Sequence, residues 1–371
     1  YLRALAAFLL IILCAPAASA AAPIAVLTID GAIGPANADY VVRGISRAAR
    51  DGSQLVILQI DTPGGLDTAM RDIIKAILTA PLPVASFVAP GGARAASAGT
   101  YILYASHIAA MAPGTNIGAA TPVQVGIGPD GGASPRPPAG KEGAGKDDNA
   151  GGPMARKATN DAAAYIRGLA QMRGRNADWG EKSVRESLSL PADEALKLQV
   201  IDLVAPDLAG LAKALHGRKV QVRGRDVTLD TEGAPLNATQ PDWRTRALSA
   251  LTNPSIALIL MTLGVYGMMF EFMNPGAVAP GVIGALCLLL GLYGLQLLPV
   301  NYAGLAFILL GIGFMIGEAF LPSFGILGLG GVAAFVAGAL MLIDTDLPDY
   351  GIPVGLIAAV AIVSAVLIAA T

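Results

Sequence analysis

The final third of the chain has no lysine or arginine, because none follows Arg246. Five apolar segments of spanning length fill this region, at residues 255–273, 277–297, 303–320, 325–343 and 352–370. An α-helix needs about 20 apolar residues to cross a bilayer, where every backbone polar group must be paired internally. We therefore predict an all-α transmembrane domain of four or five helices at residues 251–371, which fits the 54% apolar content of the chain.

An internal repeat divides this region into two similar helical hairpins. Four residues of the first hairpin have the same spacing as four of the second: Glu271, Pro275, Gly281 and Gly284, then Glu318, Pro322, Gly328 and Gly331. An acidic residue near the end of a span is costly unless it has a partner or a function. We predict that each glutamate caps its hairpin and hydrogen-bonds the partner helix, and a functional proton or ion site is the alternative.

The first 20 residues are typical of a secretory signal peptide. Arg3 precedes the apolar core at residues 9–13, and small residues at 18–20 provide a cleavage site. An uncleaved anchor helix is the alternative, and either would place the next domain outside the cytoplasm. Arg244 and Arg246, which this topology puts on the outer side, argue mildly against it. The chain starts at Tyr1 and stops inside an apolar run, so we expect it to be a fragment.

Residues 21–215 alternate short β-rich runs with amphipathic helical patterns, which indicates an α/β domain. Strands are predicted at residues 24–29, 55–60, 84–88 and 200–204. A crossover helix begins near Leu66, with Arg71 expected on its solvent face. Residues 126–152 are rich in Gly, Pro and charge and are predicted to be a flexible insert, and residues 216–250 a linker that could contain a small hairpin.

Composition excludes several classes of function. The two cysteines, Cys14 and Cys287, both lie in apolar runs, and only two histidines occur, so we expect neither a metal site nor a cofactor. The 25 basic and 27 acidic residues nearly cancel, which gives no long-range field for nucleic acid.

A candidate nucleophile follows the strand predicted at residues 84–88. Residues 91–99 are small except for Arg94, and they present Ser97 where a helix over 100–106 is predicted to begin. Small neighbours leave a hydroxyl accessible, and the N–H of Ala98 could donate to an oxyanion. The loop at residues 61–65 could supply the other donor from Gly64 or Gly65, although by itself it is typical of a structural turn.

A serine hydroxyl needs a base, and neither histidine is suitable. His107 lies ten residues along the same helix, about 15 Å away at 1.5 Å per residue, and His216 lies beyond the last predicted core strand. Lys157 begins a helix predicted at residues 154–172, where neighbouring alanines would desolvate its ammonium. An ordinary solvated lysine is the alternative. Lys141 and Lys146 lie in the flexible insert and are poorer candidates.

The combined motifs resemble those of the NfeD-type membrane-bound serine proteases. The matching runs are residues 61–66 (DTPGGL), 95–102 (AASAGTYI), 111–119 (MAPGTNIGA), 157–160 (KATN) and 190–196 (LPADEAL). The resemblance implies a ClpP/crotonase fold, a βα-superhelix, for the soluble domain. It also implies Ser97 as nucleophile, Lys157 as general base, and the Gly65 and Ala98 N–H groups as oxyanion donors, with Gly64 nearly as good. Ala120 stands where ClpP has its catalytic histidine, which favours a Ser–Lys dyad over a triad.

The resemblance also implies partners and a location. The expected substrate or partner is a stomatin- or prohibitin-family membrane protein, cut in its apolar C-terminal segment. The protein would be a multi-pass, homo-oligomeric component of the cell membrane, in contact with lipid, with its protease domain outside the cytoplasm. Relatives often carry a further β-barrel domain after the spans. Alternative functions are a signal-peptide-peptidase-like protease, a crotonase-type acyl-CoA enzyme and a non-catalytic membrane scaffold.

Overall fold

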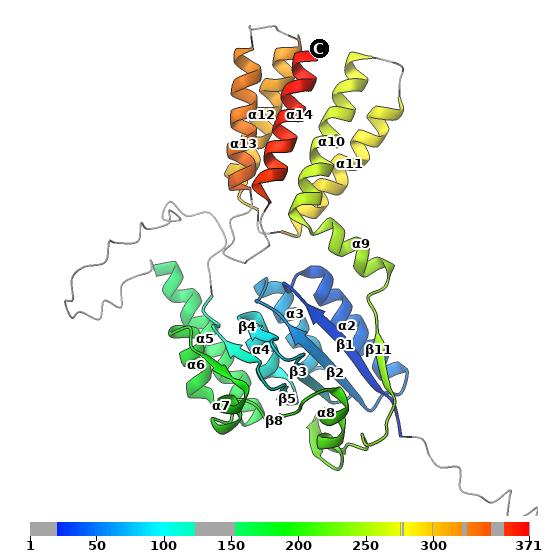
Figure 1. Ribbon diagram of the computed structural model, residues 1–371, viewed down its shortest axis with the longest axis vertical. Helices are drawn as coiled ribbons and strands as arrows, with labels where there is room; N and C mark the ends of the chain where they lie inside the picture. Colours follow the sequence, from blue (N-terminus) through cyan, green and yellow to red (C-terminus); the bar gives the residue numbers. More distant parts are fainter. Residues whose placement is uncertain are drawn as a thin grey trace, which may run out of the picture.

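The computed structural model describes residues 21–122 and 153–370, apart from residues 275, 277, 299, 321–324 and 343–351. The predicted signal peptide and the predicted insert therefore lie outside the described residues. The described part forms a mixed α/β domain followed by a region of apolar helices, as expected (Figure 1).

A six-stranded sheet forms the centre of the α/β domain, and all of its strand pairs are parallel. Its strands, in spatial order, are β11 (Leu236–Thr239), β1 (Ile24–Asp30), β2 (Leu55–Asp61), β3 (Val84–Val88), β5 (Ile108–Met111) and β8 (Leu203–Val204). The first three strands predicted from the sequence are confirmed. The predicted strand at 200–204 is shortened to β8, and Val200 and Ile201 are buried in the turn before it.

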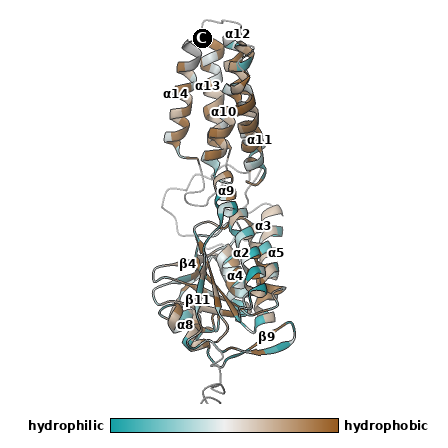
Figure 2. Cartoon of the chain, turned by 90° about the vertical axis from the view of Figure 1, so that its right-hand side faces the viewer, coloured by the Kyte–Doolittle hydropathy of each residue, from teal (hydrophilic) through white to brown (hydrophobic). Residues whose placement is uncertain are grey.

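Both faces of this sheet are buried, because its strands are apolar at consecutive positions rather than at alternate ones. One face packs against the helices α2 (Pro35–Arg50), α3 (Asp67–Leu78), α4 (Ala98–Ala105) and α5 (Pro153–Arg173). The other face packs against α8 (Leu208–Leu215) and the hairpin of β9 (Lys219–Val222) and β10 (Arg225–Thr228). Figure 2 shows the helices α2, α3, α4 and α5 together on one side.

A smaller sheet lies beside the carboxyl ends of the central strands. It consists of β4 (Arg94–Ala96), β6 (Asn116–Gly118) and β7 (Ser189–Pro191), with β4 and β6 parallel and β7 antiparallel to β6. Two short helices, α6 (Ala177–Arg185) and α7 (Ala192–Lys197), precede and follow β7.

Residues 216–250, which we expected to be a linker, are folded against the domain. Besides the β9–β10 hairpin they contain β11, which extends the central sheet beside β1, and α9 (Trp243–Leu251), which packs on α2. The hydroxyl of Tyr40 on α2 donates to the carbonyl of Thr239 on β11. This segment is therefore a part of the domain that leads into the apolar region.

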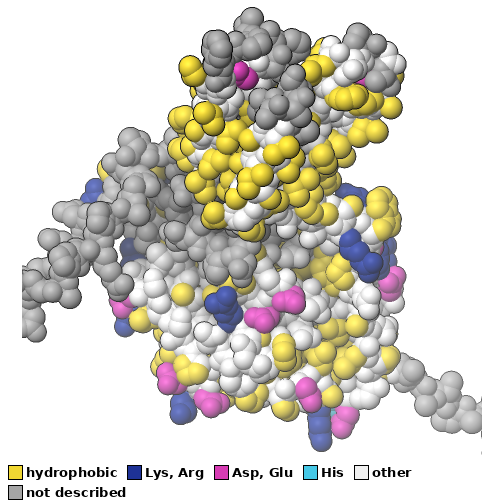
Figure 3. All heavy atoms as spheres, turned by 45° about the horizontal axis from the view of Figure 1, so that its top comes forward, with side chains coloured by type: hydrophobic (Ala, Val, Ile, Leu, Met, Phe, Trp, Pro, Cys, Tyr) yellow, Lys and Arg dark blue, Asp and Glu magenta, His cyan; other side chains and the backbone are white. Residues whose placement is uncertain are grey.

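Five apolar helices follow: α10 (Pro254–Met273), α11 (Ala279–Gln296), α12 (Tyr302–Phe320), α13 (Ile326–Met341) and α14 (Val354–Ala370). Among the described residues, α10 and α11 are long and apolar enough to cross a membrane, and the described apolar parts of the other three helices are shorter. Exposed apolar side chains cover the bundle, whereas charged side chains are concentrated on the α/β domain (Figures 2 and 3).

The two hairpins of this bundle pack in the same way. A Cβ on Gly284 would lie 2.8 Å from the carbonyl oxygen of Gly264, and one on Gly331 would lie 2.7 Å from that of Gly311. These glycines let the backbones of each helix pair approach closely. The carboxylate of Glu318 accepts hydrogen bonds from two backbone N–H groups in the first turn of α13, which agrees with the predicted cap.

Glu271 occupies the matching position of the first hairpin. A Cβ on Gly281 would lie 2.8 Å from its Cγ, so the glutamate side chain packs against the start of α11. Its Oε2 atom is buried and has no hydrogen-bond partner among the described residues. The two glutamates therefore share a position but differ in their hydrogen bonds.

Candidate active site

Ser97 lies at the sharp turn between β4 and α4. Its backbone has φ 50° and ψ −114°, a conformation that a residue with a side chain rarely adopts. The turn is fixed because the Ser97 N–H donates to the carbonyl of Gly118 at 3.0 Å and the Ser97 carbonyl accepts from the N–H of Thr100. A serine held in strained backbone between a strand and a helix is the arrangement of a nucleophile elbow.

The loop that follows β2 is tied directly to this turn. Buried Thr62 forms two backbone hydrogen bonds with the Ser97 segment, donating to Arg94 at 2.7 Å and accepting from Ala96 at 3.1 Å. The carboxylate of Asp61 accepts from the Arg94 N–H at 3.0 Å. The two loops therefore form one rigid unit.

Gly64 lies against the serine side chain. A Cβ on Gly64 would lie 2.7 Å from the Cβ of Ser97 and 3.2 Å from its Oγ, and Gly64 has φ +126°. Both observations require glycine, because a side chain would strain the backbone and displace the serine. Its neighbour Gly65 is equally constrained, since a Cβ there would collide with the backbone of Ile33.

The loop geometry distinguishes between the candidate oxyanion donors. The N–H of Gly64 donates to the hydroxyl oxygen of Thr62 at 3.1 Å, which occupies this amide within its own loop. No hydrogen bond from the Gly65 or Ala98 N–H is found in the described part of the chain. Ala98 is also the first residue of α4, where amides have no intrahelical partner. Gly65 and Ala98 are therefore better donors than Gly64.

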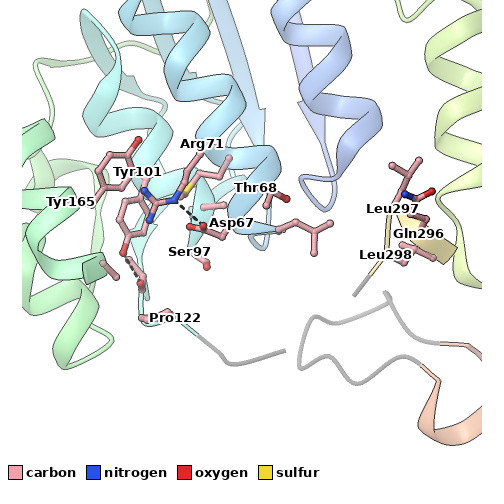
Figure 4. Close-up of a pocket in the computed structure, with 16 residues that line it drawn as sticks. Asp67, Thr68, Arg71, Ser97, Tyr101, Pro122, Tyr165, Gln296, Leu297 and Leu298 are labelled. Carbon is pink, nitrogen blue, oxygen red and sulfur yellow. Dashed lines mark hydrogen bonds and ion pairs between the residues drawn. The ribbon is translucent and has the colours of Figure 1, made fainter. Parts of the chain in front are cut away.

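A pocket of about 440 Å³ opens beside Ser97 (Figure 4). Its walls come from the loop after β2, from α3, α4 and α5, and from the α11–α12 turn: Gly65, Leu66, Asp67, Thr68, Met70, Arg71, Ser97, Ala98, Tyr101, Ala120, Pro122, Ala162, Tyr165, Gln296, Leu297 and Leu298. Apolar side chains dominate the lining, so the pocket suits an apolar peptide segment.

A cluster of aromatic and charged side chains forms one wall of the pocket. The Arg71 guanidinium lies 4.5 Å from the centre of the Tyr165 ring and is paired with Asp67 at 2.8 Å and Asp161 at 3.0 Å. Tyr165 stacks on Tyr101, whose pKa is raised mainly by burial. We expected Arg71 on the solvent face of its helix, and its side chain is 41% exposed, but solvent is not its only neighbour. Arg71 also bridges α3 to α5.

Lys157 is exposed near the start of α5, one turn after Pro153, and is not among the residues that line the pocket. The predicted desolvation by neighbouring alanines is therefore wrong, because Lys157 is exposed and Ala158 and Ala162 are only half-buried. Lys157 does precede Asp161 and Tyr165 by one and two helical turns, so it lies on the side of α5 that faces the pocket.

His107 lies in the turn between α4 and β5, not on the helix where we expected it. Burial, together with Arg173 and Arg175, lowers the pKa of His107 from 6.5 to about 4. Its Nδ1 accepts from the N–H of Val84, and it does not line the pocket. His216 is exposed and pairs with Asp230 at the far end of the domain.

Two families of known proteins match this chain by their sequence models. The NfeD integral membrane domain matches residues 255–371, and the NfeD1b N-terminal domain matches residues 24–133. A membrane-bound protease of Pyrococcus horikoshii is 37% identical over 85% of this chain and 68% of its own length. The membrane protein NfeD1b of Bacillus subtilis is 29% identical over 82% of this chain and 63% of its own length.

Solved structures of a membrane-bound stomatin-specific protease resemble the α/β domain. A lysine-to-alanine variant in complex with a substrate peptide is 37% identical and covers 62% of this chain and 97% of that one, with a TM-score of 0.52. A serine-to-alanine variant of the same protease is 38% identical and covers 60% of this chain and 100% of that one, with a TM-score of 0.51.

Proposed function

This chain belongs to the NfeD family of membrane proteins, which includes membrane-bound proteases, and we propose that it is a membrane-anchored serine endopeptidase with Ser97 as nucleophile and Lys157 as general base. The observation that carries the proposal is the geometry around Ser97. Its strained turn presents the hydroxyl to an apolar pocket, beside two amides that no other described group occupies. The sequence similarity to a membrane-bound protease also supports the assignment as a protease.

The chemistry follows from these groups. Bound substrate would exclude water from the Lys157 amine and so favour its neutral form. The Ser97 oxygen attacks the peptide carbonyl while that neutral amine accepts the hydroxyl proton. The Gly65 and Ala98 amides donate to the developing oxyanion, which they stabilise because they are already oriented before the reaction begins. Lys157 returns the proton to the leaving amine, and a water molecule then hydrolyses the acyl-enzyme in the reverse sequence of proton transfers.

Lys157 reaches Ser97 only after a movement of the start of α5. Catalytic hydrogen bonds are often long or absent without substrate and form in the complex. The Arg71 bridge to Asp161 holds the next turn of this helix at the pocket wall. In this proposal, substrate binding brings the lysine to the serine.

The substrate is a membrane protein of the stomatin or prohibitin family, cut in an apolar segment. The related protease of known structure is described as stomatin-specific, and the apolar lining of the pocket supports the same preference here. The chain crosses the cell membrane several times, and its α/β domain lies outside the cytoplasm. It works as a homo-oligomer.

A serine-directed fluorophosphonate probe tests this proposal. The parent protein in lipid nanodiscs should be labelled on Ser97, and labelling should disappear in Ser97→Ala and weaken strongly in Lys157→Ala. Ser46→Ala, which removes an exposed serine of α2, should be labelled like the parent. Undiminished labelling of Ser97→Ala would exclude Ser97 as the nucleophile and favour a scaffold role.

A further inference from the structure

One wall of the catalytic pocket belongs to the apolar helical region. Gln296, Leu297 and Leu298, at the end of α11 and the turn toward α12, line the same cavity as Ser97 (Figure 4). Leu298 is buried in the core of the helical bundle, Leu297 is half-buried and Gln296 is exposed. The pocket is therefore enclosed partly by the α/β domain and partly by the end of the bundle that faces it.

Helix α9 fixes this turn against the α/β domain. Arg43 of α2 donates to both carboxylate oxygens of Asp242, at 2.7 and 3.1 Å, and to the hydroxyl of Thr245 at 2.9 Å. Asp242 also caps α9 by accepting from the Thr245 N–H. A bidentate arginine–carboxylate pair has defined geometry, so it sets the direction of α9 relative to α2.

The other end of α9 contacts α11 directly. Gly294 lies so close to the carbonyl oxygen of Leu251, at the end of α9, that a Cβ on Gly294 would collide with it. The contact lies two residues before Gln296. An unbroken series of contacts therefore runs from α2 through α9 to the turn at the pocket.

We propose that residues 296–298 form the membrane-side wall of the substrate pocket, and that the enzyme cuts a segment lying directly at the membrane surface. The inference rests on the proposed function and specifies its substrate. A turn between two apolar helices lies at the end of the bundle, where those helices leave the bilayer. A substrate anchored in the same membrane therefore meets Gln296 and Leu297 as its chain emerges, before it reaches Ser97.

This placement predicts a strong dependence on the distance between the anchor and the scissile bond. A tethered segment has an effective concentration that is greatest when the tether matches the span and falls as about the −3/2 power of longer lengths. With the site at the membrane surface, a spacer of about four residues should be cleaved about tenfold faster than one of about 20.

The experiment compares two substrates in proteoliposomes with the full chain. Both carry the same apolar cleavage sequence and the same anchor helix, and they differ only in a flexible spacer of about four or about 20 residues. The measured quantity is the ratio of their initial cleavage rates. Each variant provides its own reference, because a general loss of activity lowers both rates.

Two kinds of variant should lower this ratio toward one. Gln296→Trp fills the membrane-side wall and should obstruct the short-spacer substrate most, while Arg43→Ala removes the link that orients α9. The controls are Leu292→Ala, an exposed residue of α11 outside the pocket, and Arg50→Ala, an exposed arginine of α2. Both controls should keep the ratio of the parent.

The outcomes separate the inference from the proposed function. A parent ratio near one, or a ratio that neither Gln296→Trp nor Arg43→Ala lowers, would overturn the membrane-side wall while leaving the protease assignment in place. A parent protein that cleaves neither substrate, nor a water-soluble peptide of the same sequence, would instead refute the proposed function.

Discussion

Gly64 and Ser97 are packed so closely that a single added carbon on the glycine would lie 2.7 Å from the serine Cβ. Gly64→Ala should therefore push the nucleophile out of line with its oxyanion donors. A displacement of about 1 Å at a reacting atom can cost on the order of 10²-fold in rate. We expect a loss of that size in kcat/KM for an apolar peptide.

Gly52→Ala is the matched control for this change. Gly52 also has a positive φ, +73°, but a Cβ there would meet nothing within 4 Å. A side chain at the φ of Gly52 costs about 1 kcal/mol or somewhat more, whereas at Gly64, with φ +126°, the backbone strain is larger and adds to the collision with Ser97. Only Gly64→Ala should lose activity. Equal activity of the two variants would contradict the close packing of Gly64 on Ser97.

Arg175 should be a major contributor to the stability of the α/β domain. Its side chain is buried, donates to the carbonyls of Tyr104 and Ser106 at 2.9 Å, and pairs with Asp202 at 2.7 Å. Removing Arg175 leaves Asp202 without its partner and two carbonyls without their donor, and a hydrogen bond to a charged group contributes about 1.5–3 kcal/mol. Arg175→Ala should show such a loss in denaturant unfolding followed by tryptophan fluorescence.

The exposed ion pair of Arg167 and Glu181 supplies the comparison, at 2.6 Å. Arg167→Ala should cost much less than Arg175→Ala, because its side chain is 39% exposed and water screens ion pairs near the surface. A loss for Arg175→Ala no larger than that for Arg167→Ala would show that the buried pair does not stabilise the fold as proposed.

His107 should make stability depend on pH. Because burial lowers its pKa from 6.5 to about 4 in the folded state, the unfolded chain binds its proton first as the pH falls. Stability should therefore decrease as the pH drops from 6.5 to about 4. His107→Gln should flatten this part of the profile of unfolding midpoint against pH, whereas His216→Gln should not. An unchanged slope in His107→Gln would argue against this assignment.

The role of Lys157 can be separated from that of a fixed positive charge. Lys157→Ala should lower kcat by about 10²–10⁴-fold, as expected for loss of a general base. Lys157→Arg should be equally impaired, because a guanidinium keeps its proton at any usable pH. Lys182→Ala, on the exposed side of α6, should retain activity. Substantial cleavage by Lys157→Arg would identify the lysine as an electrostatic anchor.

The fold was predictable where the sequence has a strong local pattern. The strands β1, β2 and β3 and the bundle helices are continuous apolar runs, and their observed bounds differ by only a few residues from those expected. β11 was missed because three of its four residues are exposed, so its pairing with β1 leaves no hydrophobic signal. Its position depends on backbone pairing and on the Tyr40 contact, which no local pattern reveals.

The candidate site was predictable only in part, for a similar reason. Small residues around Ser97 and after β2 signal close backbone approach, and the structure brings both loops together. The sequence indicated an exposed Arg71, but helical periodicity could not show that its guanidinium also contacts Tyr165 and Asp161 of α5. No sequence pattern indicated that Gln296 and Leu297 line the pocket, because their position there depends on how α9 connects the α/β domain to the apolar helices.

The most direct test of the account is the rate at which the full-length protein, in lipid nanodiscs, cleaves an apolar peptide from the C-terminal segment of a stomatin-family protein. The parent should cleave it, Ser46→Ala should match the parent, and Ser97→Ala should lose at least about 10³-fold in kcat. Circular dichroism should show that Ser97→Ala remains folded, since only an oxygen atom is removed. Cleavage by Ser97→Ala within tenfold of the parent rate would contradict the central claim that Ser97 is the nucleophile.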